Sequence, residues 1–319
     1  MAVYTKLSTD RIKDILRGYS LNNIDRISEI PEGILNTNYL VEGGGEKFIF
    51  RILEGKRDYR EEVKELDFLH YMNSKGFPCP VALNNTQGKN YTVVEGKMAS
   101  VFTFIEGEKV DTIDRRSIRE IGRNLGIMHN LLRNNDIKRN RMIDMDYFYD
   151  IISRADLKGI LGRRYDTIMK LYKRAASVDY SVLPQGIIHN DIFPDNVFMK
   201  NGVISGLIDF NDCLKGPLIL DLAIVINFWI RNKNLSSKEE AVLTEELLQA
   251  YEEERPLSQE EKEFMNEAIL KVALTFIFLR INKFHVEDTS GVNMEVKDHS
   301  DLFPLLEYYL GGNNEIYQF

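Results

Sequence analysis

Hydrophobic and polar residues alternate along the first third of the chain in the way that is typical of short β-strands. Turn-forming segments separate the apolar runs, and Pro31–Gly33 and Gly43–Gly45 are the clearest of them. The pattern predicts strands at 25–30, 37–42, 47–53, 91–94 and 98–105, and helices near 9–19 and at 59–74. We therefore expect a small, strand-rich lobe at residues 1–105.

Beyond about residue 112 the apolar residues recur with the 3.6-residue period of helices. This period predicts helices at 116–133, 145–178, 218–231, 237–254, 259–284 and 301–310, with an island of strands at 186–189, 197–199 and 203–209. Residues 106–319 should therefore form a larger, mostly helical lobe. Two unequal lobes joined by one short connection favour a ligand cleft between them.

The composition is 44% apolar and 28% charged, which is typical of a soluble globular protein with a sizeable core. The net charge of −8 argues against nucleic acid or an anionic membrane surface as a partner. Cys79 and Cys213 stand far apart, so neither a disulfide scaffold nor a thiolate zinc site is expected. The first residues resemble no secretion signal, and no apolar run reaches the roughly 18 residues of a spanning helix. We expect a cytoplasmic protein.

The densest polar cluster lies between two predicted strands, at residues 188–197. Asp191 and Asn196 have the D-x-x-x-x-N spacing of a phosphotransferase catalytic loop. A carboxylate at the start of such a loop can orient an attacking hydroxyl and accept its proton, while an amide oxygen further along can bind a metal ion. Asp209 ends the next apolar strand and supplies a second, charged oxygen of the kind Mg²⁺ prefers. A plain polar turn is the alternative interpretation, but the flanking strands and Asp209 favour the catalytic one.

These motifs resemble those of the aminoglycoside phosphotransferase and choline kinase superfamily, and within it the bacterial homoserine kinases. The matching pieces are spread over the chain: Met1–Thr5, Phe193–Phe198, Ser205–Phe210, Asp221–Ile224 and Arg255–Ser258. The resemblance implies an α+β, bilobal protein-kinase-like fold with a small antiparallel-sheet N-lobe and a larger helical C-lobe. Residues 1–105 would bind the nucleotide, and residues 106–319 would carry catalysis and the substrate.

The resemblance also implies roles for the cluster. Asp191 is similar to the catalytic base, and Asn196 and Asp209 are similar to the ligands of the Mg²⁺ that accompanies ATP. Asp221 matches an aspartate that binds loop backbone amides, although a simple helix N-terminal carboxylate is an equal alternative. His129 follows a helical apolar stripe and is expected to be a packed, structural histidine.

In the first lobe, Arg51 stands where the superfamily usually has a phosphate-binding lysine. Glu65 matches the glutamate that pairs with this basic residue, with Glu62 as the alternative, and either could be a helix-surface charge paired with Lys64 or Arg60. The resemblance assigns the remaining nucleotide contacts to a turn and to the connection between the lobes: Gly33, Asn36, Thr37, Thr103 and Ile105.

The implied reaction is transfer of the ATP γ-phosphoryl group to a small-molecule hydroxyl, with L-homoserine as the acceptor. Residues 211–217 depart from the homoserine kinases, which usually carry an aromatic-rich stretch there. Asp212, in this segment, could bind a second Mg²⁺ or a substrate ammonium group, or cap a turn. Arg280, a cation inside an apolar helix, could bind a substrate carboxylate or pair with an acid such as Asp221.

Two alternatives therefore stay open. One is a kinase for an aminoglycoside, choline or another amino alcohol, because an ammonium-bearing acceptor is common to the superfamily. The other is a catalytically silent, kinase-like binding protein. Such proteins typically lose the loop aspartate or a metal ligand, whereas Asp191, Asn196 and Asp209 are all present here.

Overall fold

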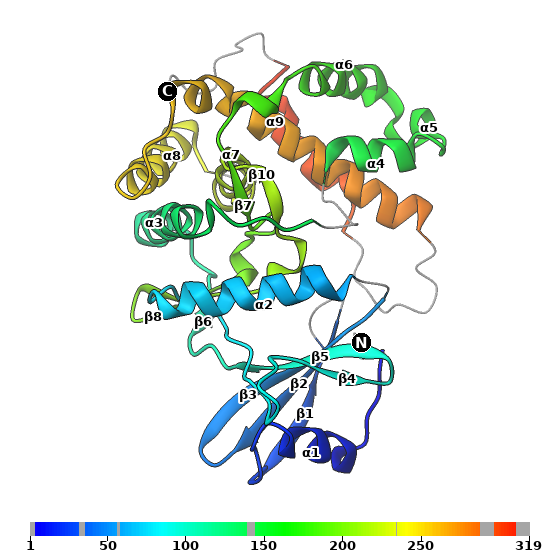
Figure 1. Cartoon of the computed structure of the whole chain (residues 1–319). Helices are drawn as coiled ribbons and strands as arrows, with labels where there is room; N and C mark the ends of the chain where they lie inside the picture. Colours follow the sequence, from blue (N-terminus) through cyan, green and yellow to red (C-terminus); the bar gives the residue numbers. More distant parts are fainter. Residues whose placement is uncertain are drawn as a thin grey trace. The chain divides into compact units, whose positions relative to one another are not determined.

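The computed structural model describes residues 4–31, 36–55, 58–138, 144–233, 235–287 and 297–310. Its chain divides into two compact units: the first consists mainly of residues up to Gly107 together with Ser205–Ile208, and the second contains most of the remainder. The first unit is strand-rich and the second is mostly helical, and Figure 1 labels the elements of both. The assignment of nucleotide binding to residues 1–105 and of catalysis to residues 106–319 stays a prediction.

The helices are α1 Thr9–Arg17, α2 Tyr59–Ser74, α3 Arg115–Leu132, α4 Met145–Ile152, α5 Leu157–Leu161, α6 Tyr165–Ala176, α7 Ile219–Val225, α8 Ser237–Glu252, α9 Gln259–Ile281 and α10 Pro304–Glu307. The strands are β1 Arg26–Ile30, β2 Asn36–Gly43, β3 Glu46–Leu53, β4 Thr92–Val94, β5 Lys97–Thr103, β6 Glu108–Lys109, β7 Gln185–Ile188, β8 Val197–Lys200, β9 Val203–Leu207 and β10 Leu214–Pro217. In the described part of the chain, no helix is long and apolar enough to cross a membrane.

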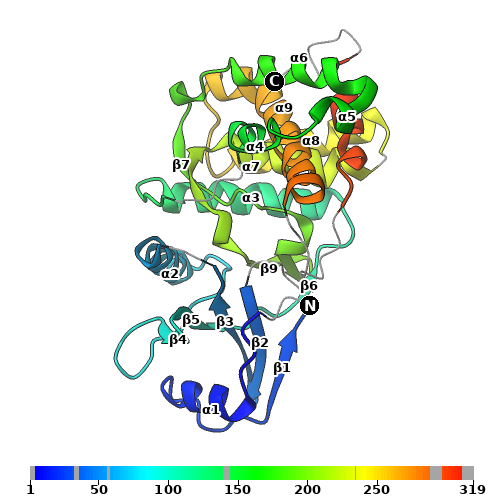
Figure 2. The same ribbon diagram turned by 90° about the vertical axis from the view of Figure 1, so that its right-hand side faces the viewer.

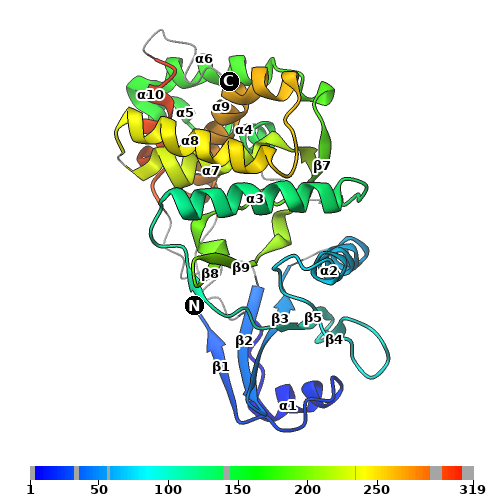
Figure 3. The same cartoon turned by 90° about the vertical axis from the view of Figure 1, so that its left-hand side faces the viewer.

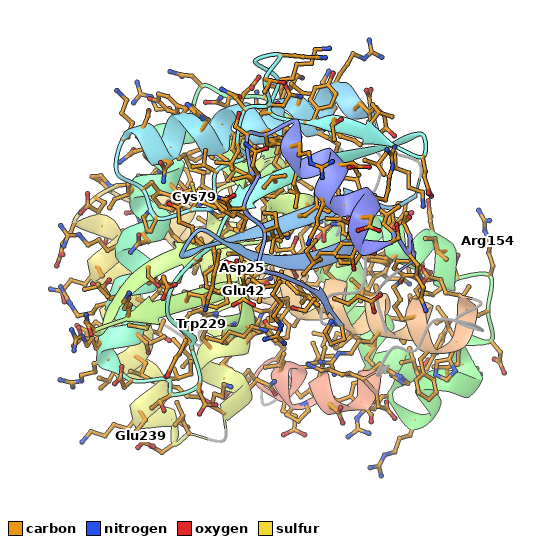
Figure 4. All side chains as sticks on the ribbon, turned by 90° about the horizontal axis from the view of Figure 1, so that it is seen from below. Asp25, Glu42, Cys79, Arg154, Trp229 and Glu239 are labelled. Carbon is orange, nitrogen blue, oxygen red and sulfur yellow. The ribbon has the colours of Figure 1, made fainter. Side chains whose placement is uncertain are left out.

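The first unit is built on an antiparallel sheet in the order β1-β2-β3-β5-β4 (Figure 2). The sheet begins where the Asp25 amide donates to the Glu42 carbonyl at 2.8 Å, two residues that lie side by side in Figure 4. Alternate residues of β3, such as Phe50 and Ile52, are fully buried, as the period-2 pattern requires. The apolar face of α1 packs on the same core. All five strands predicted for this region are confirmed.

The second unit is a helical assembly in which α4, α6 and α7 contact the long helix α9. Serine N-caps start α8 and α9, each with a glutamate three residues into the helix that completes a capping box. In Figure 4 the Glu239 side chain of the α8 box points outward from its helix.

Three sequence expectations for the second unit need correction. The predicted helix 145–178 is three helices, because the Asp156 side chain caps a new start and Gly162, at φ +52°, ends α5. The helix expected over 259–284 leaves the α-form after Ile281 and continues as a π-turn. Strand β10, inside the polar segment 211–217, was not predicted at all; it pairs antiparallel with β7.

Helices α3 and α8 run side by side, as Figure 3 shows. Two glycines spaced four apart on α3 allow this approach. A methyl group on Gly122 would lie 2.5 Å from the Leu247 carbonyl oxygen, and one on Gly126 would lie 2.9 Å from that of Tyr251. Neither glycine can gain a side chain without a shift of the α8 backbone.

We therefore expect Gly122→Ala to lower the free energy of unfolding by about 1–3 kcal/mol, the typical cost of overpacking. Equilibrium denaturation in urea measures this change. The control is Lys238→Ala, an exposed position on α8 that should change stability by less than about 0.5 kcal/mol. A stability for Gly122→Ala equal to that of the control would contradict the close approach of the two helices.

Candidate active site

The loop between β7 and β8, residues 189–196, is called the catalytic loop below. Two of its polar residues, Asp191 and Asn196, are joined: the Asn196 side-chain amide donates to the Asp191 carbonyl at 2.8 Å and to the Asp191 carboxylate at 2.9 Å. The Phe193 amide also donates to the Asp191 carbonyl, at 2.9 Å. These hydrogen bonds close the five-residue segment from Asp191 to Asn196 into one turn, and this turn orients the Asp191 carboxylate.

Asp221 of α7 holds the backbone of the catalytic loop. The two carboxylate oxygens of this fully buried side chain accept the amides of His189, at 2.7 Å, and of Asn190, at 2.9 Å. Asn190 has a φ of +65°, a left-handed conformation that such amide contacts help to hold. The expectation that Asp221 binds loop amides is confirmed.

Trp229 holds the loop just after Asp191. Its indole N–H donates to the Ile192 carbonyl at 2.8 Å, and its ring is completely buried (labelled in Figure 4). Trp229 belongs to a π-turn, Ile226–Ile230, that continues α7. The sequence reasoning assigned no role to this residue. The available signal was that a lone Trp in an apolar run needs a partner for its N–H.

Asp209 follows β9 and has φ +65° and ψ +62°. This left-handed conformation is uncommon outside Gly, Asn and Asp. One of its carboxylate oxygens accepts the side-chain amide of Asn211. Asp212 lies near the same loop, because its carbonyl accepts the Asn190 side-chain amide at 3.4 Å. The chain thus brings Asp191, Asp209 and Asp212 into one region of the second unit.

The pKa of Asp191 is raised well above its usual value, first because burial disfavours the charged form. The negative charges of Asp212, Asp209 and Asp195 raise it further, in that order, while the hydrogen bond from Asn196 acts in the opposite direction. A carboxylate with a raised pKa accepts a proton more readily, which suits a general base.

The donor atoms also fit a hard divalent cation. The Asn196 amide nitrogen is occupied by Asp191, so its carbonyl oxygen is the atom left for a metal. The second Asp209 oxygen, which does not accept the Asn211 amide, is the corresponding atom there. Within the described ranges, no group of three or more His, Cys, Asp and Glu side chains could hold a metal ion. Two protein oxygens supplemented by phosphate and water are the coordination that Mg²⁺ commonly takes.

The first unit contains Arg51, the residue that is expected to bind phosphate. Its Nε donates to the Asn38 side chain at 3.0 Å, and its guanidinium lies 5.4 Å from the centre of the Phe102 ring. Glu62 and Glu65 of α2 are both buried, with exposed fractions of 5% and 4%. The alternative that either is a surface charge is therefore wrong. Burial does not decide which of the two pairs with the arginine.

The side chains expected to cradle phosphate are occupied inside the first unit. The buried Thr37 hydroxyl donates to Glu54 at 2.7 Å and accepts the Tyr4 amide at 2.9 Å. The Asn36 side-chain oxygen accepts the Glu54 amide at 3.4 Å. The Thr37 hydroxyl is thus engaged within the first unit, whereas the Asn36 side-chain NH2 group is not part of these hydrogen bonds, and its phosphate contact stays a prediction. Gly33 lies outside the described residues.

At the connection between the units, Thr103 is paired with Val81. The Thr103 amide donates to the Val81 carbonyl at 2.9 Å, and its hydroxyl accepts the Val81 amide at 3.0 Å. The Thr103 amide is thus unavailable to an adenine ring, while the hydroxyl keeps its own proton to donate. Ile105 packs closely on Gly206, where a methyl group would lie 2.4 Å from the isoleucine side chain.

Arg280 does pair with an acid, as one alternative expected, but that acid is Asp301 and not Asp221. Its guanidinium donates to the Asp298 carbonyl at 2.8 Å and lies 3.6 Å from the Asp301 carboxylate. Burial lowers the pKa of Arg280, while Asp301 and Asp298 partly offset the effect. The substrate-binding role of this residue stays a prediction.

Comparison with known proteins agrees with this geometry. The sequence model of the phosphotransferase enzyme family matches residues 26–261. A homoserine kinase of Sinorhizobium medicae is 29% identical over 290 residues, covering 88% of this chain and 86% of the relative.

Two solved structures are similar to this chain. An amicoumacin kinase in complex with AMP-PNP, Ca²⁺ and Ami has a TM-score of 0.68 at 14% identity and covers 94% of this chain and 95% of its own. A microcompartment-associated aminopropanol kinase has the same TM-score at 18% identity and covers 97% and 99%. The α+β, protein-kinase-like fold predicted from the sequence is confirmed. The chain belongs to the phosphotransferase enzyme family and is an ATP-dependent kinase that acts on a hydroxyl group of a small molecule.

Proposed function

We propose that this kinase transfers the γ-phosphoryl group of ATP to the side-chain hydroxyl of L-homoserine, giving O-phospho-L-homoserine and ADP. The observation that carries the choice of substrate is the likeness to homoserine kinases, which extends over 88% of the chain. A likeness confined to the catalytic loop would support only the reaction and not the acceptor.

In the proposed reaction Asp191 is the catalytic base. Its carboxylate accepts the proton of the acceptor hydroxyl as the oxygen bonds to the γ-phosphorus and the bond from phosphorus to the bridging oxygen of ADP breaks. The Asn196 amide holds one carboxylate oxygen of Asp191 at 2.9 Å. The remaining oxygen is the atom proposed to receive the proton. The contribution of the chain is therefore positioning combined with a carboxylate of raised pKa.

Asn196 and Asp209 are proposed to hold the Mg²⁺ that accompanies ATP. When bound, this ion supplies charge neutralisation at the phosphates. Neutralising Asp209 would also remove one of the negative charges that raise the pKa of Asp191. Arg51 and the backbone of the first unit are proposed to contact the nucleotide, with Glu65 supporting Arg51.

The polar ends of homoserine need two further partners. Asp212 is proposed to attract the ammonium group, because its charge already acts on Asp191 and hence lies near the reacting centre. Arg280 is proposed to bind the carboxylate. One of its N–H groups is used by the Asp298 carbonyl, and a guanidinium has five.

A second candidate is a kinase for an amino alcohol that lacks a carboxylate. The solved aminopropanol kinase, with a TM-score of 0.68 over 97% of the chain, favours it. Both candidates require an ammonium site, and only homoserine requires a cation for its carboxylate. In this proposal Arg280 distinguishes the two acceptors, whereas Asp191 acts on the hydroxyl of either one.

We expect Asp191→Asn to lower kcat by about 10²- to 10⁴-fold, since the asparagine cannot accept the hydroxyl proton. The folded protein should be as stable as the wild type or more so, because burial disfavours the charge that is removed. ADP release and thermal unfolding measure the two effects. Asp166→Asn, an exposed position on α6, is the matched control. Turnover by Asp191→Asn within threefold of the control would show that Asp191 is not the base.

Acceptor identity is tested by a panel of L-homoserine, 1-amino-2-propanol, choline and an aminoglycoside. We expect kcat/KM to be highest for L-homoserine by at least about tenfold, the effect of one charge-assisted hydrogen bond of about 1.5 kcal/mol. Coupled detection of ADP, with mass spectrometry of the phosphorylated product, makes the measurement. Turnover confined to an aminoglycoside or to the amino alcohol would refute the proposed substrate.

Replacing Arg280 separates the two candidates. Arg280→Gln can still donate to the Asp298 carbonyl but loses the charge, so we expect KM for L-homoserine to rise about 10- to 100-fold. KM for any amino alcohol that the wild type phosphorylates should be unchanged. Arg163→Gln, at an exposed position, is the control. Equal effects on both acceptors, or no effect on either, would exclude a carboxylate site at Arg280.

A further inference from the structure

A series of buried, hydrogen-bonded side chains extends from the catalytic loop into the second unit, with members on four helices. The ring of His129, on α3, lies between Asp221 and Tyr251: its Nε2 is 3.1 Å from the Asp221 carboxylate and its Nδ1 is 2.8 Å from the Tyr251 hydroxyl. Arg255, just beyond α8, donates to the same hydroxyl at 3.0 Å and to Glu261 of α9 at 3.0 Å. His129, Asp221, Tyr251 and Glu261 have no exposed surface.

The two ends of this chain fix the direction of every hydrogen bond within it. Arg255 can only donate and the Asp221 carboxylate can only accept. His129 must therefore present an Nε2–H to Asp221, which leaves Nδ1 as an acceptor. The Tyr251 hydroxyl accepts from Arg255 and donates its own proton to Nδ1. One arrangement of protons satisfies all the groups, and in it His129 is neutral.

The tyrosine is well suited to keep its proton, because burial raises its pKa. Arg255 is in turn held in place by the start of α9. The Glu261 carboxylate accepts from Arg255 and also from the Ser258 amide at 3.0 Å, within the capping box of that helix. The cation at the head of the chain is thus anchored to a long, buried helix.

A proton on Nδ1 would break this arrangement. The Tyr251 hydroxyl would then face two donors, Nδ1–H and Arg255, and its own proton would lose its acceptor. A protonated ring would also place a positive charge against Asp221, the carboxylate that accepts the amides of His189 and Asn190. Charge-assisted hydrogen bonds are roughly twice as strong as neutral ones. The two loop contacts are therefore strongest while no positive charge on His129 neutralises the Asp221 carboxylate.

We propose that Tyr251 and Arg255 are positioning residues for catalysis, because they hold His129 in its neutral Nε2–H form and so reserve the Asp221 carboxylate for the catalytic loop. The proposal rests on the assignment of Asp191 as the base, since Asp191 is the residue that the loop positions. It does not depend on which hydroxyl compound is the acceptor. The titratable groups in contact with His129 are Asp221 from α7 and Tyr251 from α8. Arg255 and Glu261 lie behind Tyr251, and His189 is bound to Asp221 through its backbone amide.

The test is Tyr251→Phe, which removes the donor to Nδ1 and leaves the packing of the ring in place. Without the Tyr251 hydroxyl no donor faces Nδ1, so His129 can take up a second proton as the pH falls and then pair with Asp221 as a cation. We expect kcat of the variant to be within threefold of wild type at pH 8, and the ratio of variant to wild type to fall about tenfold between pH 8 and pH 5.5. KM for ATP should stay constant, because no nucleotide contact changes.

Two controls make this readout specific. Tyr309→Phe also removes one buried hydroxyl, which donates to the Asn266 carbonyl at 2.9 Å, and its ratio to wild type should not vary with pH. The double variant Tyr251→Phe/His129→Gln restores a side chain that can donate to Asp221 but cannot titrate, so the extra pH dependence should disappear. A pH-independent ratio for Tyr251→Phe would overturn the proposal and leave Tyr251 a structural residue.

The wild-type protein offers a second measurement that is independent of how the variants fold. Nitrogen-15 NMR of the histidine rings, with His129 assigned by its absence in His129→Gln, should show a neutral Nε2–H ring from pH 8 to pH 6. A doubly protonated ring in that range would refute the proposal. The kinetic assays use whichever acceptor the wild type turns over, so a different substrate would not affect them. If Asp191→Asn kept its activity, the role of Asp191 would fail separately.

Discussion

The hydrogen bonds from two loop amides to the Asp221 carboxylate are the interaction on which the rest of the site depends. They hold Asn190 at a left-handed φ of +65°, a conformation that is uncommon outside Gly, Asn and Asp, and so position the next residue, Asp191. A charged side chain with no exposed surface is costly unless it is fully paired. Here the two amides and His129 provide that pairing.

Other residues of the second unit also hold the catalytic loop or the side chains that support it. Trp229 contacts the loop from a π-turn, Asn196 closes it from the far end, and Tyr251 and Arg255 support His129 from behind. The Trp229 contact links the loop to the π-turn after α7, and the Asp221 contacts link it through His129 to α3 and α8. The catalytic loop is therefore fixed by the packed interior of the helical unit, which suits a reaction in which the protein contributes mainly positioning.

The sequence was informative wherever one local pattern determines the structure. Alternation predicted the strands of the first unit, and the D-x-x-x-x-N spacing placed Asp191 and Asn196 in one loop between two strands, where the structure joins them by a hydrogen bond. It was uninformative where distant residues decide the outcome. Thr37 looked like a phosphate contact, but its hydroxyl binds Glu54, and Arg280 found Asp298 and Asp301 where Asp221 was a candidate partner. Strand β10 was missed because its pairing with β7, not its composition, makes it a strand.

The central contact of the proposed reaction is the hydrogen bond that the acceptor hydroxyl donates to the carboxylate oxygen of Asp191 that Asn196 does not hold. A crystal structure of the protein with a non-hydrolysable ATP analogue, Mg²⁺ and L-homoserine tests it most directly. We expect a distance of about 2.6–3.2 Å between the homoserine hydroxyl oxygen and that carboxylate oxygen, with Asn196 still bound to the other oxygen. A homoserine hydroxyl hydrogen-bonded to a different side chain, with Asp191 out of reach, would contradict it.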